Sequence, residues 1–256
     1  MSVHPALPRL VLSLADTKRV LGLRYSDWLL GAPSIEAGIA AASMAQDEWG
    51  HARLLYALLK DMGVDPMEVE HERAASAYAS VPALDGPFEN WAAFVAGVVI
   101  VDGALTAALD HLQQGGYAPA SGRVAKMVTE EAFHGELGEA WFQRLAGGSP
   151  VAVERLREAV AHMMPSTLHA LAPGDGGAQA LAGGGHTPAP ETLAQVIREK
   201  WLPWATLVDL PVPEWSWATG NAPQGWDDQR SRTEGEPDQD VVERARGDRN
   251  RALFVE

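Results

Sequence analysis

Two segments of the sequence repeat a glutamate–histidine spacing that can bind a metal ion. Glu48 precedes His51 by three residues, and Glu131 precedes His134 by three residues. On a helix, residues three apart face the same side, so each pair can reach one small volume. Carboxylate oxygen and imidazole nitrogen together suit iron or manganese, with zinc less favoured.

The apolar pattern around these pairs predicts that they face a protein interior. Small and medium apolar residues surround Glu48 on its helical face, and another apolar stripe surrounds Glu131. Asp102 ends a run of apolar residues and falls on the buried side of a third helix. Burial of a carboxylate without a partner costs roughly several kcal/mol of folding free energy. We therefore expect a cation to neutralise these carboxylates, and a metal ion is the simplest one.

The alternative is that both pairs are surface ion-pairing residues, which requires both to fall on apolar faces by chance. Asp47 and Glu130 are further carboxylates beside these pairs, but they lie off the apolar stripes. We therefore expect Asp47 and Glu130 to be solvated.

The first helix departs from a complete two-metal pattern, which needs a carboxylate there. Its apolar stripe is centred on Lys18, and both Asp16 and Asp27 fall on the opposite face. A buried Lys18 can pair with a carboxylate and replace one unit of metal charge. Alternatively, Lys18 extends to the bundle end and Asp27 approaches through a local distortion. Tyr25 either donates a hydrogen bond to a ligand carboxylate or only packs against its neighbours in the core. Two metals, one metal or none remain open.

Helical periodicity dominates the first two thirds of the chain and places these residues on elements. Glycine and proline breaks predict helices near 10–30, 34–62, 87–114, 119–146 and 150–164. The long loop 63–86 fits an all-α, ferritin-like helical bundle with one crossover connection.

The remaining chain predicts additions to this bundle. Residues 1–170 form the bundle, 171–188 a mobile glycine-rich linker, and 189–256 a short helix and an extended Trp/Pro-rich tail that packs on the bundle. The tail tryptophans either cover apolar bundle surface or form a subunit interface.

Composition excludes several classes of function. The chain has 256 residues, a formal net charge of −14 and no cysteine. The charge argues against nucleic acid as a partner, and the absence of cysteine excludes disulfides, thiolate metal sites and iron–sulfur clusters. The most apolar stretch is too short to span a membrane, and no secretory signal is visible, so we expect a cytoplasmic protein.

Five motifs in order resemble the phenylacetic acid catabolic protein family, the ferritin-like subunits of the multicomponent phenylacetyl-CoA epoxidase. They are Tyr25-Ser-Asp-Trp28, Ala32-Pro-Ser-Ile-Glu36, Gln46-Asp-Glu-Trp-Gly-His51, Val101-Asp-Gly103 and Glu130-Glu-Ala-Phe-His134. The resemblance covers about residues 10–146 and leaves out the tail. The family includes a catalytic di-iron subunit and a related structural subunit that has lost its ligands.

The resemblance implies a metal site but also a departure from it. The iron ligands of the catalytic subunit match Glu48, His51, Asp102, Glu131 and His134, whereas Lys18 stands where a first-helix glutamate is expected. No catalytic residue beyond these ligands and no other cofactor site is implied. The chain thus has features between the catalytic and the structural subunit.

The activity implied is that of a di-iron monooxygenase that epoxidises the ring of an aromatic acyl-CoA, with manganese less likely than iron. Electrons come from a separate reductase, and the chain forms a homodimer or a hetero-oligomer with related ferritin-like subunits. Coenzyme A phosphates would need a basic patch, for which we expect Arg53, Arg73 and Arg123. The alternatives are a non-catalytic scaffold subunit and a ferritin-like protein that handles metal or reduces peroxide.

Overall fold

A computed structural model describes residues 4–215, 217, 222–251 and 253. Within these residues the chain is helical, and the β-type pairing is an isolated bridge between Asp227 and Arg232. The prediction of an all-α, ferritin-like bundle is confirmed. The main helices are α1 (Leu7–Ser26), α2 (Ile35–Lys60), α4 (Trp91–Ala96), α5 (Gly103–Gln113), α6 (Ala118–Ala146), α7 (Pro150–Leu171) and α9 (Pro190–Leu207).

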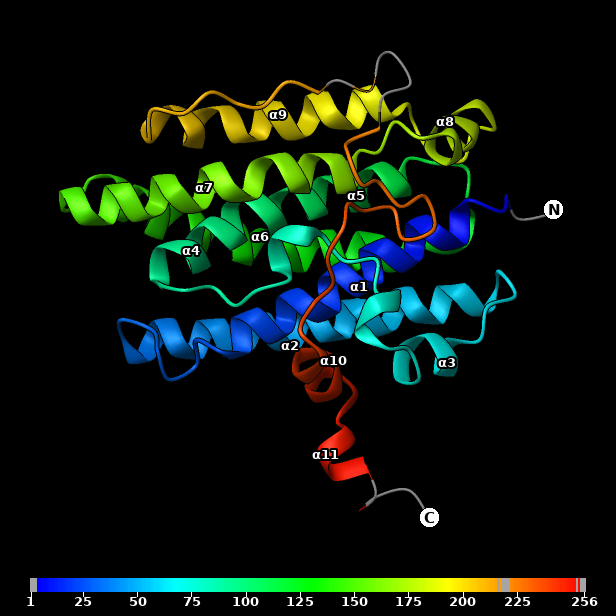
Figure 1. Ribbon diagram of the computed structural model, residues 1–256, viewed down its shortest axis with the longest axis horizontal. Coiled ribbons are helices and arrows are strands. Elements are labelled where there is room, and N and C mark those ends of the chain that lie inside the picture. Colours follow the sequence, from blue (N-terminus) through cyan, green and yellow to red (C-terminus); the bar gives the residue numbers. More distant parts are fainter. Residues whose placement is uncertain (1–3, 216, 218–221, 252, 254–256) are drawn as a thin grey trace.

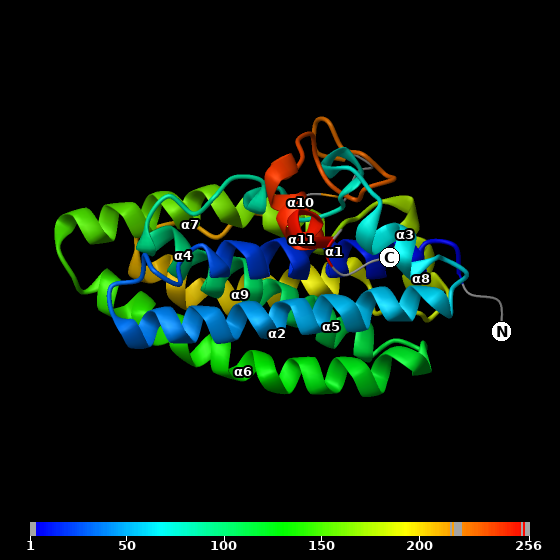
Figure 2. The ribbon, with the colours of Figure 1, turned by 90° about the horizontal axis from the view of Figure 1, so that it is seen from below.

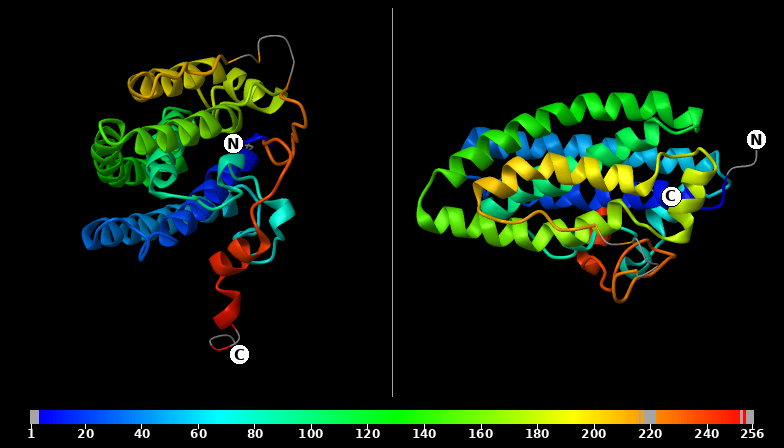
Figure 3. Two further views of the ribbon diagram at one scale, coloured as in Figure 1. Left: turned by 60° about the vertical axis from the view of Figure 1, so that its left-hand side comes forward. Right: turned by 90° about the horizontal axis from the view of Figure 1, so that it is seen from above.

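The helices form a bundle with one covering helix (Figure 1). α1 and α2 lie side by side in the lower part of the bundle in this view, above α10 and α11 of the tail, and α4, α5, α6 and α7 lie above them. α9 packs on α5 and α7 at the far side, so α5 is enclosed (Figure 3). From below, α2 and α6 run next to each other (Figure 2), which brings the two Glu-x-x-His segments together.

The crossover between α2 and α4 is not a bare loop. It contains α3 (Pro66–His71) and two short 3₁₀ turns, Ala75–Ala77 and Pro82–Leu84. The carboxylate of Asp16 on α1 accepts hydrogen bonds from the Ala79 amide (2.8 Å) and from the Arg73 guanidinium (2.9 Å) in this crossover. α1 is therefore buried on both faces, which explains why the whole run from Ser13 to Tyr25 is buried.

α4 and α5 form one helical run that is interrupted by a π-helical segment, Gly97–Asp102. Asn90 begins the run, because its side chain accepts the Ala93 amide at 3.0 Å. The run Trp91–Gln113 is long and apolar enough to cross a membrane, but 89% of its most apolar window is buried inside the protein. It is therefore the core helix of the bundle, and it is longer than the apolar stretch read from the sequence.

Two segments are more regular than the sequence indicates. α7 passes through Pro165 and continues to Leu171, because its last turns bury Met164, Leu168 and Leu171. The glycine-rich stretch contains α8 (Gly176–Gly183), which is capped by the Asp175 carboxylate at the Ala178 amide (2.8 Å). Glycine permits a close approach here, because a Cβ on Gly115 would lie 1.8 Å from the His186 carbonyl oxygen.

The tail packs on the bundle and contains two more helices, α10 (Gln239–Arg246) and α11 (Asp248–Arg251). Trp215 donates from Nε1 to the Ala172 carbonyl (2.8 Å), and Trp217 is buried. Trp204 packs edge-on against Phe142, with ring centroids 5.3 Å apart. These tryptophans cover apolar surface of their own chain, which is the first of the two roles considered above.

Candidate metal centre

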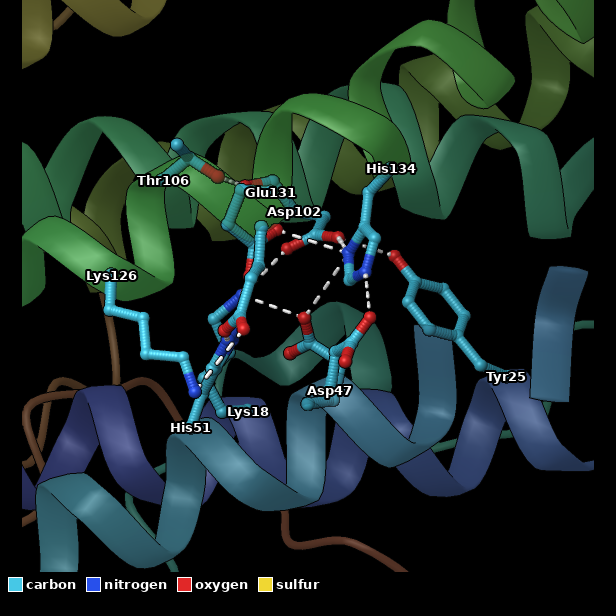
Figure 4. Close-up of polar contacts among 11 residues, drawn as sticks. Lys18, Tyr25, Asp47, His51, Asp102, Thr106, Lys126, Glu131 and His134 are labelled. Atoms are coloured by element: carbon cyan, nitrogen blue, oxygen red, sulfur yellow. Dashed lines mark hydrogen bonds and ion pairs between the residues drawn. The ribbon is translucent and has the colours of Figure 1, made fainter. Parts of the chain in front are cut away.

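Charged side chains from four helical segments meet in the middle of the bundle (Figure 4). Each is buried, with less than 5% of its surface exposed. α1 supplies Lys18, the π-helical segment ends on Asp102, α2 supplies Glu48 and His51, and α6 supplies Glu131 and His134. The five residues predicted as ligands therefore converge, and Lys18 converges with them.

Lys18 lies among the three carboxylates. Its Nζ atom is 2.8 Å from Glu48 Oε1 and 2.9 Å from Asp102 Oδ1, and it also donates to Glu131 Oε1. An ammonium group has three N–H donors and no acceptor, so each donor has one carboxylate partner. The lysine side chain has no exposed surface.

Lys18 and Glu131 stabilise each other's ionised forms. Burial alone would lower the pKa of Lys18, but Asp102, Glu131 and Glu48 outweigh burial and hold this pKa well above its usual value. Burial would raise the pKa of Glu131, but Lys18 and the hydrogen bonds from the histidines hold it well below its usual value. Glu131 is therefore an ionised partner of the ammonium group.

The other two titrating groups move toward their protonated forms. Burial and the charge of Asp102 raise the pKa of Glu48, in spite of Lys18. Burial would lower the pKa of His134, but its hydrogen bonds to Asp102, Glu131 and Glu48 raise it far above its usual value. Two protonated bases thus face three carboxylates, one of which has a raised proton affinity, and the cluster approaches neutrality without an added ion.

Both imidazoles have one nitrogen toward the cluster and the other toward an outer carboxylate of the opposite helix. His51 Nδ1 lies 3.0 Å from Glu131 Oε1, and its Nε2 lies 2.9 Å from Glu130 Oε2 on α6. His134 Nδ1 lies 3.1 Å from Asp102 Oδ2.

His134 on α6 makes the corresponding contact with a carboxylate on α2. His134 Nε2 lies 3.4 Å from Asp47 Oδ2 on α2. Asp47 and Glu130 are half-buried, so the expectation that they are only solvated is wrong. A repeated signal was present in the sequence, because both segments read acid-Glu-x-x-His.

Tyr25 and Asp27 differ in their relation to the cluster. Tyr25 donates from its hydroxyl to Asp102 Oδ2 at 3.0 Å, and burial together with Asp102 raises the pKa of this phenol, so it remains a donor. Asp27 accepts instead from Arg244 on α10 at 2.7 Å. The arrangement in which Lys18 leaves the site and Asp27 enters it is not the one that the chain adopts.

The donor set suits a metal ion, but the space does not. Ligand atoms of Glu48, Asp102, Glu131 and His134 lie within 4.8 Å of one another, and Glu48 Oε2 is a buried oxygen with no hydrogen-bond partner. However, the Lys18 ammonium stands between the carboxylates, where a bridging ion would be held. With Lys18 in this position, the residues do not fit a two-metal centre.

A cavity of about 280 Å³ adjoins the cluster between α5, α6 and α9. Its lining includes Asp102, Glu131 and His134 of the cluster, and also Glu136, Glu139, Lys200 and Trp204.

Two of the three arginines proposed for a phosphate patch are paired with carboxylates. Arg73 binds the buried Asp16, and Arg123 lies 4.0 Å from Asp61. The geometry of these two side chains therefore gives no support to a coenzyme A phosphate site.

Comparison with known proteins adds the family. The family described as "Phenylacetic acid catabolic protein" matches residues 2–247 and so includes the tail, which the sequence motifs had left out. The chain is also similar to a protein of Escherichia coli (strain K12) that is named as one of the subunits of 1,2-phenylacetyl-CoA epoxidase, with 26% identity over 151 residues. That match spans 58% of this chain and 61% of the relative, which is less than two thirds of its length. Because the family match covers almost the whole chain, the protein belongs to the phenylacetic acid catabolic protein family.

Proposed function

We propose that this chain is a non-catalytic scaffold subunit of a phenylacetyl-CoA epoxidase-type complex in aromatic acid catabolism. The observation that carries the proposal is the position of Lys18, whose ammonium group binds all three buried carboxylates of the cluster. The cluster thereby obtains its cation from its own α1 helix. We assign no step of oxygen chemistry to this chain.

The geometry favours this role over that of the di-iron monooxygenase. Two iron ions need carboxylates from four helices around them, and here α1 brings the positive charge of Lys18 instead of a carboxylate. An ammonium group inside the site repels a divalent ion and uses the oxygens that would bind it. The ferritin-like, metal-handling alternative meets the same obstacle.

A scaffold role also requires a surface that a partner can bury. Four large aliphatic side chains lie exposed within eleven residues at the α1–α2 turn, with exposed fractions of 49% for Leu29, 96% for Leu30, 80% for Ile35 and 64% for Ile39. Exposed apolar patches of this kind mark protein interaction sites. Since the similar protein is itself named as a component of an epoxidase, we assign this patch to a ferritin-like partner subunit that carries the metals, with a separate reductase supplying electrons.

The deciding experiment measures metal content and turnover. The chain is produced in iron-rich medium, reconstituted anaerobically with ferrous iron and analysed by mass spectrometry for iron per chain. We expect far less than one iron per chain, and no oxygen consumption with or without phenylacetyl-CoA. One or more irons per chain with substrate-dependent oxygen consumption would establish the monooxygenase, whereas ferrous oxidation without the acyl-CoA would establish the metal-handling role.

A second measurement tests the partner surface. The double variant Leu30→Asp, Ile35→Asp should lose co-purification with the catalytic subunit while keeping its helical circular dichroism. The control is Val151→Asp, which places one negative charge on an exposed apolar residue (70% exposed) of α7. Equal retention of the catalytic subunit by both variants would refute the assignment of this surface.

A further inference from the structure

We infer that a single side chain, Lys18, keeps metal out of this bundle, and that the remaining residues form a latent site for two divalent metal ions. The inference deepens the proposed scaffold role and rests on it for the metal-free state of the natural chain. It concerns a capacity to bind metal that the natural residue at position 18 prevents.

The ligand atoms of this latent site are already assembled. Ligand atoms of Glu48, Asp102, Glu131 and His134 lie within 4.8 Å of one another, and His51 Nδ1 is 3.0 Å from Glu131 Oε1. All five residues are buried, and their ligand atoms already lie close to one another. The unpartnered Glu48 Oε2 offers one more oxygen.

The outer carboxylates orient both imidazoles toward the cluster. A metal-bound histidine commonly donates its other ring N–H to a carboxylate, which fixes the ring with its free nitrogen toward the ion. Glu130 stands in this relation to His51, and Asp47 stands in this relation to His134. The contacts cross between α2 and α6 in both directions, so both rings are oriented for ligation in a chain that holds its cluster together with a lysine.

The length and charge of residue 18 decide whether an ion has room. A glutamate side chain is one bond shorter than a lysine, so a carboxylate oxygen there would stop short of the point where Nζ now lies and leave that point to an ion. The substitution changes three carboxylates and one ammonium into four carboxylates. Four negative charges balance two divalent ions, whereas the natural cluster has Lys18 as a cation of its own.

The experiment compares the natural chain with Lys18→Glu, Lys18→Gln and the control Lys60→Glu. Lys60 is exposed at the end of α2, so this control makes the same charge change away from the cluster. Each chain is refolded anaerobically with ferrous iron or with manganese(II), desalted and analysed for metal per chain. Thermal unfolding is recorded with and without metal.

We expect about two ions per chain for Lys18→Glu, as in other four-helix sites of this type, and about one or fewer for Lys18→Gln. The natural chain and Lys60→Glu should hold less than about a tenth of an ion, because the ammonium remains in place. Metal should raise the unfolding temperature of Lys18→Glu most, and should leave that of the natural chain and of Lys60→Glu unchanged. Adding His134→Ala to Lys18→Glu should lower its metal content and remove the rise.

The outcomes separate the two proposals. Metal in the natural chain refutes the metal-free scaffold. A metal-free natural chain together with a folded, metal-free Lys18→Glu overturns the latent site and leaves the scaffold role intact. Failure of Lys18→Glu to fold even with metal present, while Lys18→Gln folds without binding any ion, also overturns the latent site.

Discussion

Lys18 shows how a buried charge can be tolerated without an ion. Its side chain has no exposed surface, yet each of its N–H donors reaches a carboxylate. The cost of taking these charges out of water is large, and only mutual attraction with complete hydrogen bonding offsets it. Removal of one partner should therefore lower the free energy of unfolding by far more than the loss of one hydrogen bond would.

The variant Lys18→Met keeps an unbranched side chain that is one atom shorter, and removes its charge. We expect a loss of about 3–5 kcal/mol in the free energy of unfolding, because three carboxylates remain buried without their ammonium partner. Urea unfolding followed by circular dichroism measures this change. The control Lys60→Met, at an exposed position, should stay within about 0.5 kcal/mol of the natural chain, and a similar small effect for Lys18→Met would contradict the account.

Most of the charged cluster could be predicted at the residue scale, because each predicted ligand lies on an apolar stripe of its own helix. The same pattern places Lys18 on such a stripe, although it cannot name the partners of the lysine. An apolar stripe describes one helix alone, so it does not predict Asp47 and Glu130 as partners of the histidines. Their contacts with His134 and His51 cross between helices and depend on how α2 and α6 pack.

The π-helical segment Gly97–Asp102 is the element that brings Asp102 to the cluster. A π segment disturbs the regular pairing of backbone carbonyls, and Trp201 on α9 donates from Nε1 to the Ile100 carbonyl at 3.0 Å. On the other side α6 approaches closely, because a Cβ on Gly138 would lie 2.6 Å from Val98 Cγ1. The segment is therefore held between α6 and α9.

Two glycines of α6 test this packing. Alanine raises helix propensity at either position, so Gly122→Ala, which has open space around its Cβ, should stabilise the protein by about 0.5–1 kcal/mol. Gly138→Ala should instead destabilise it by about 1–3 kcal/mol, because the new methyl group meets Val98. Thermal and urea unfolding compare the two. Equal stabilisation by both substitutions would mean that α6 is not packed tightly on the π segment.

At the element scale, periodicity predicted the existence of the bundle helices but not all of their ends. Pro165 indicates a helix end, yet α7 continues because its later turns bury apolar side chains. The glycine-rich stretch indicates a mobile linker, yet α8 forms there with Asp175 as its cap. In both places contacts with distant segments outweigh the local preference of the chain, and a local pattern does not contain these contacts.

At the scale of the molecule, arginines fasten the tail to the bundle. Arg232 is fully buried and donates from Nη1 to the Ser80 carbonyl at 2.9 Å and from Nη2 to Asp85. Arg19 on α1 donates to the Ala245 carbonyl at 2.6 Å. The tail is thereby joined to the crossover segment and to α1, the helix that carries Lys18.

The variant Arg232→Met tests the attachment of the tail. It leaves the Ser80 carbonyl and Asp85 without their donor, so we expect a loss of about 1–3 kcal/mol. Limited proteolysis should cut within 222–247 faster than in the natural chain, and urea unfolding gives the overall loss. Arg155→Met, at a position that is 56% exposed on α7, is the control and should change neither measurement. An unchanged cleavage rate for Arg232→Met would show that the tail is held by other contacts.

Two histidines outside the cluster make stability sensitive to acid. Burial lowers the pKa of His111 and of His169, and His111 Nε2 donates to the Pro188 carbonyl at 3.1 Å. The unfolded chain takes up protons near a pKa of about 6.5, whereas the folded chain resists protonation. The stability that these two histidines contribute is therefore present above that pH and falls as the pH drops below it.

The double variant His111→Gln, His169→Gln should lose less stability than the natural chain between about pH 6.5 and pH 5.5, the range just below the pKa of an unfolded histidine. Urea unfolding at several pH values measures the difference. His134 acts in the opposite direction, because its raised pKa favours the folded chain as the pH falls, but both proteins contain His134, so its contribution cancels in the comparison. Parallel pH curves for the two proteins would contradict the prediction.

The positive charge of Lys18 is covalently attached to the chain, so the cluster does not depend on an ion from solution. A chelator cannot extract the charge, a competing ion cannot exchange with it, and dioxygen cannot cycle it between oxidation states. The core is complete as soon as the chain has folded, whatever the local supply of iron. In the assembly that we propose, such a chain would leave metal loading, and the oxidative damage that accompanies it, to its partner subunit.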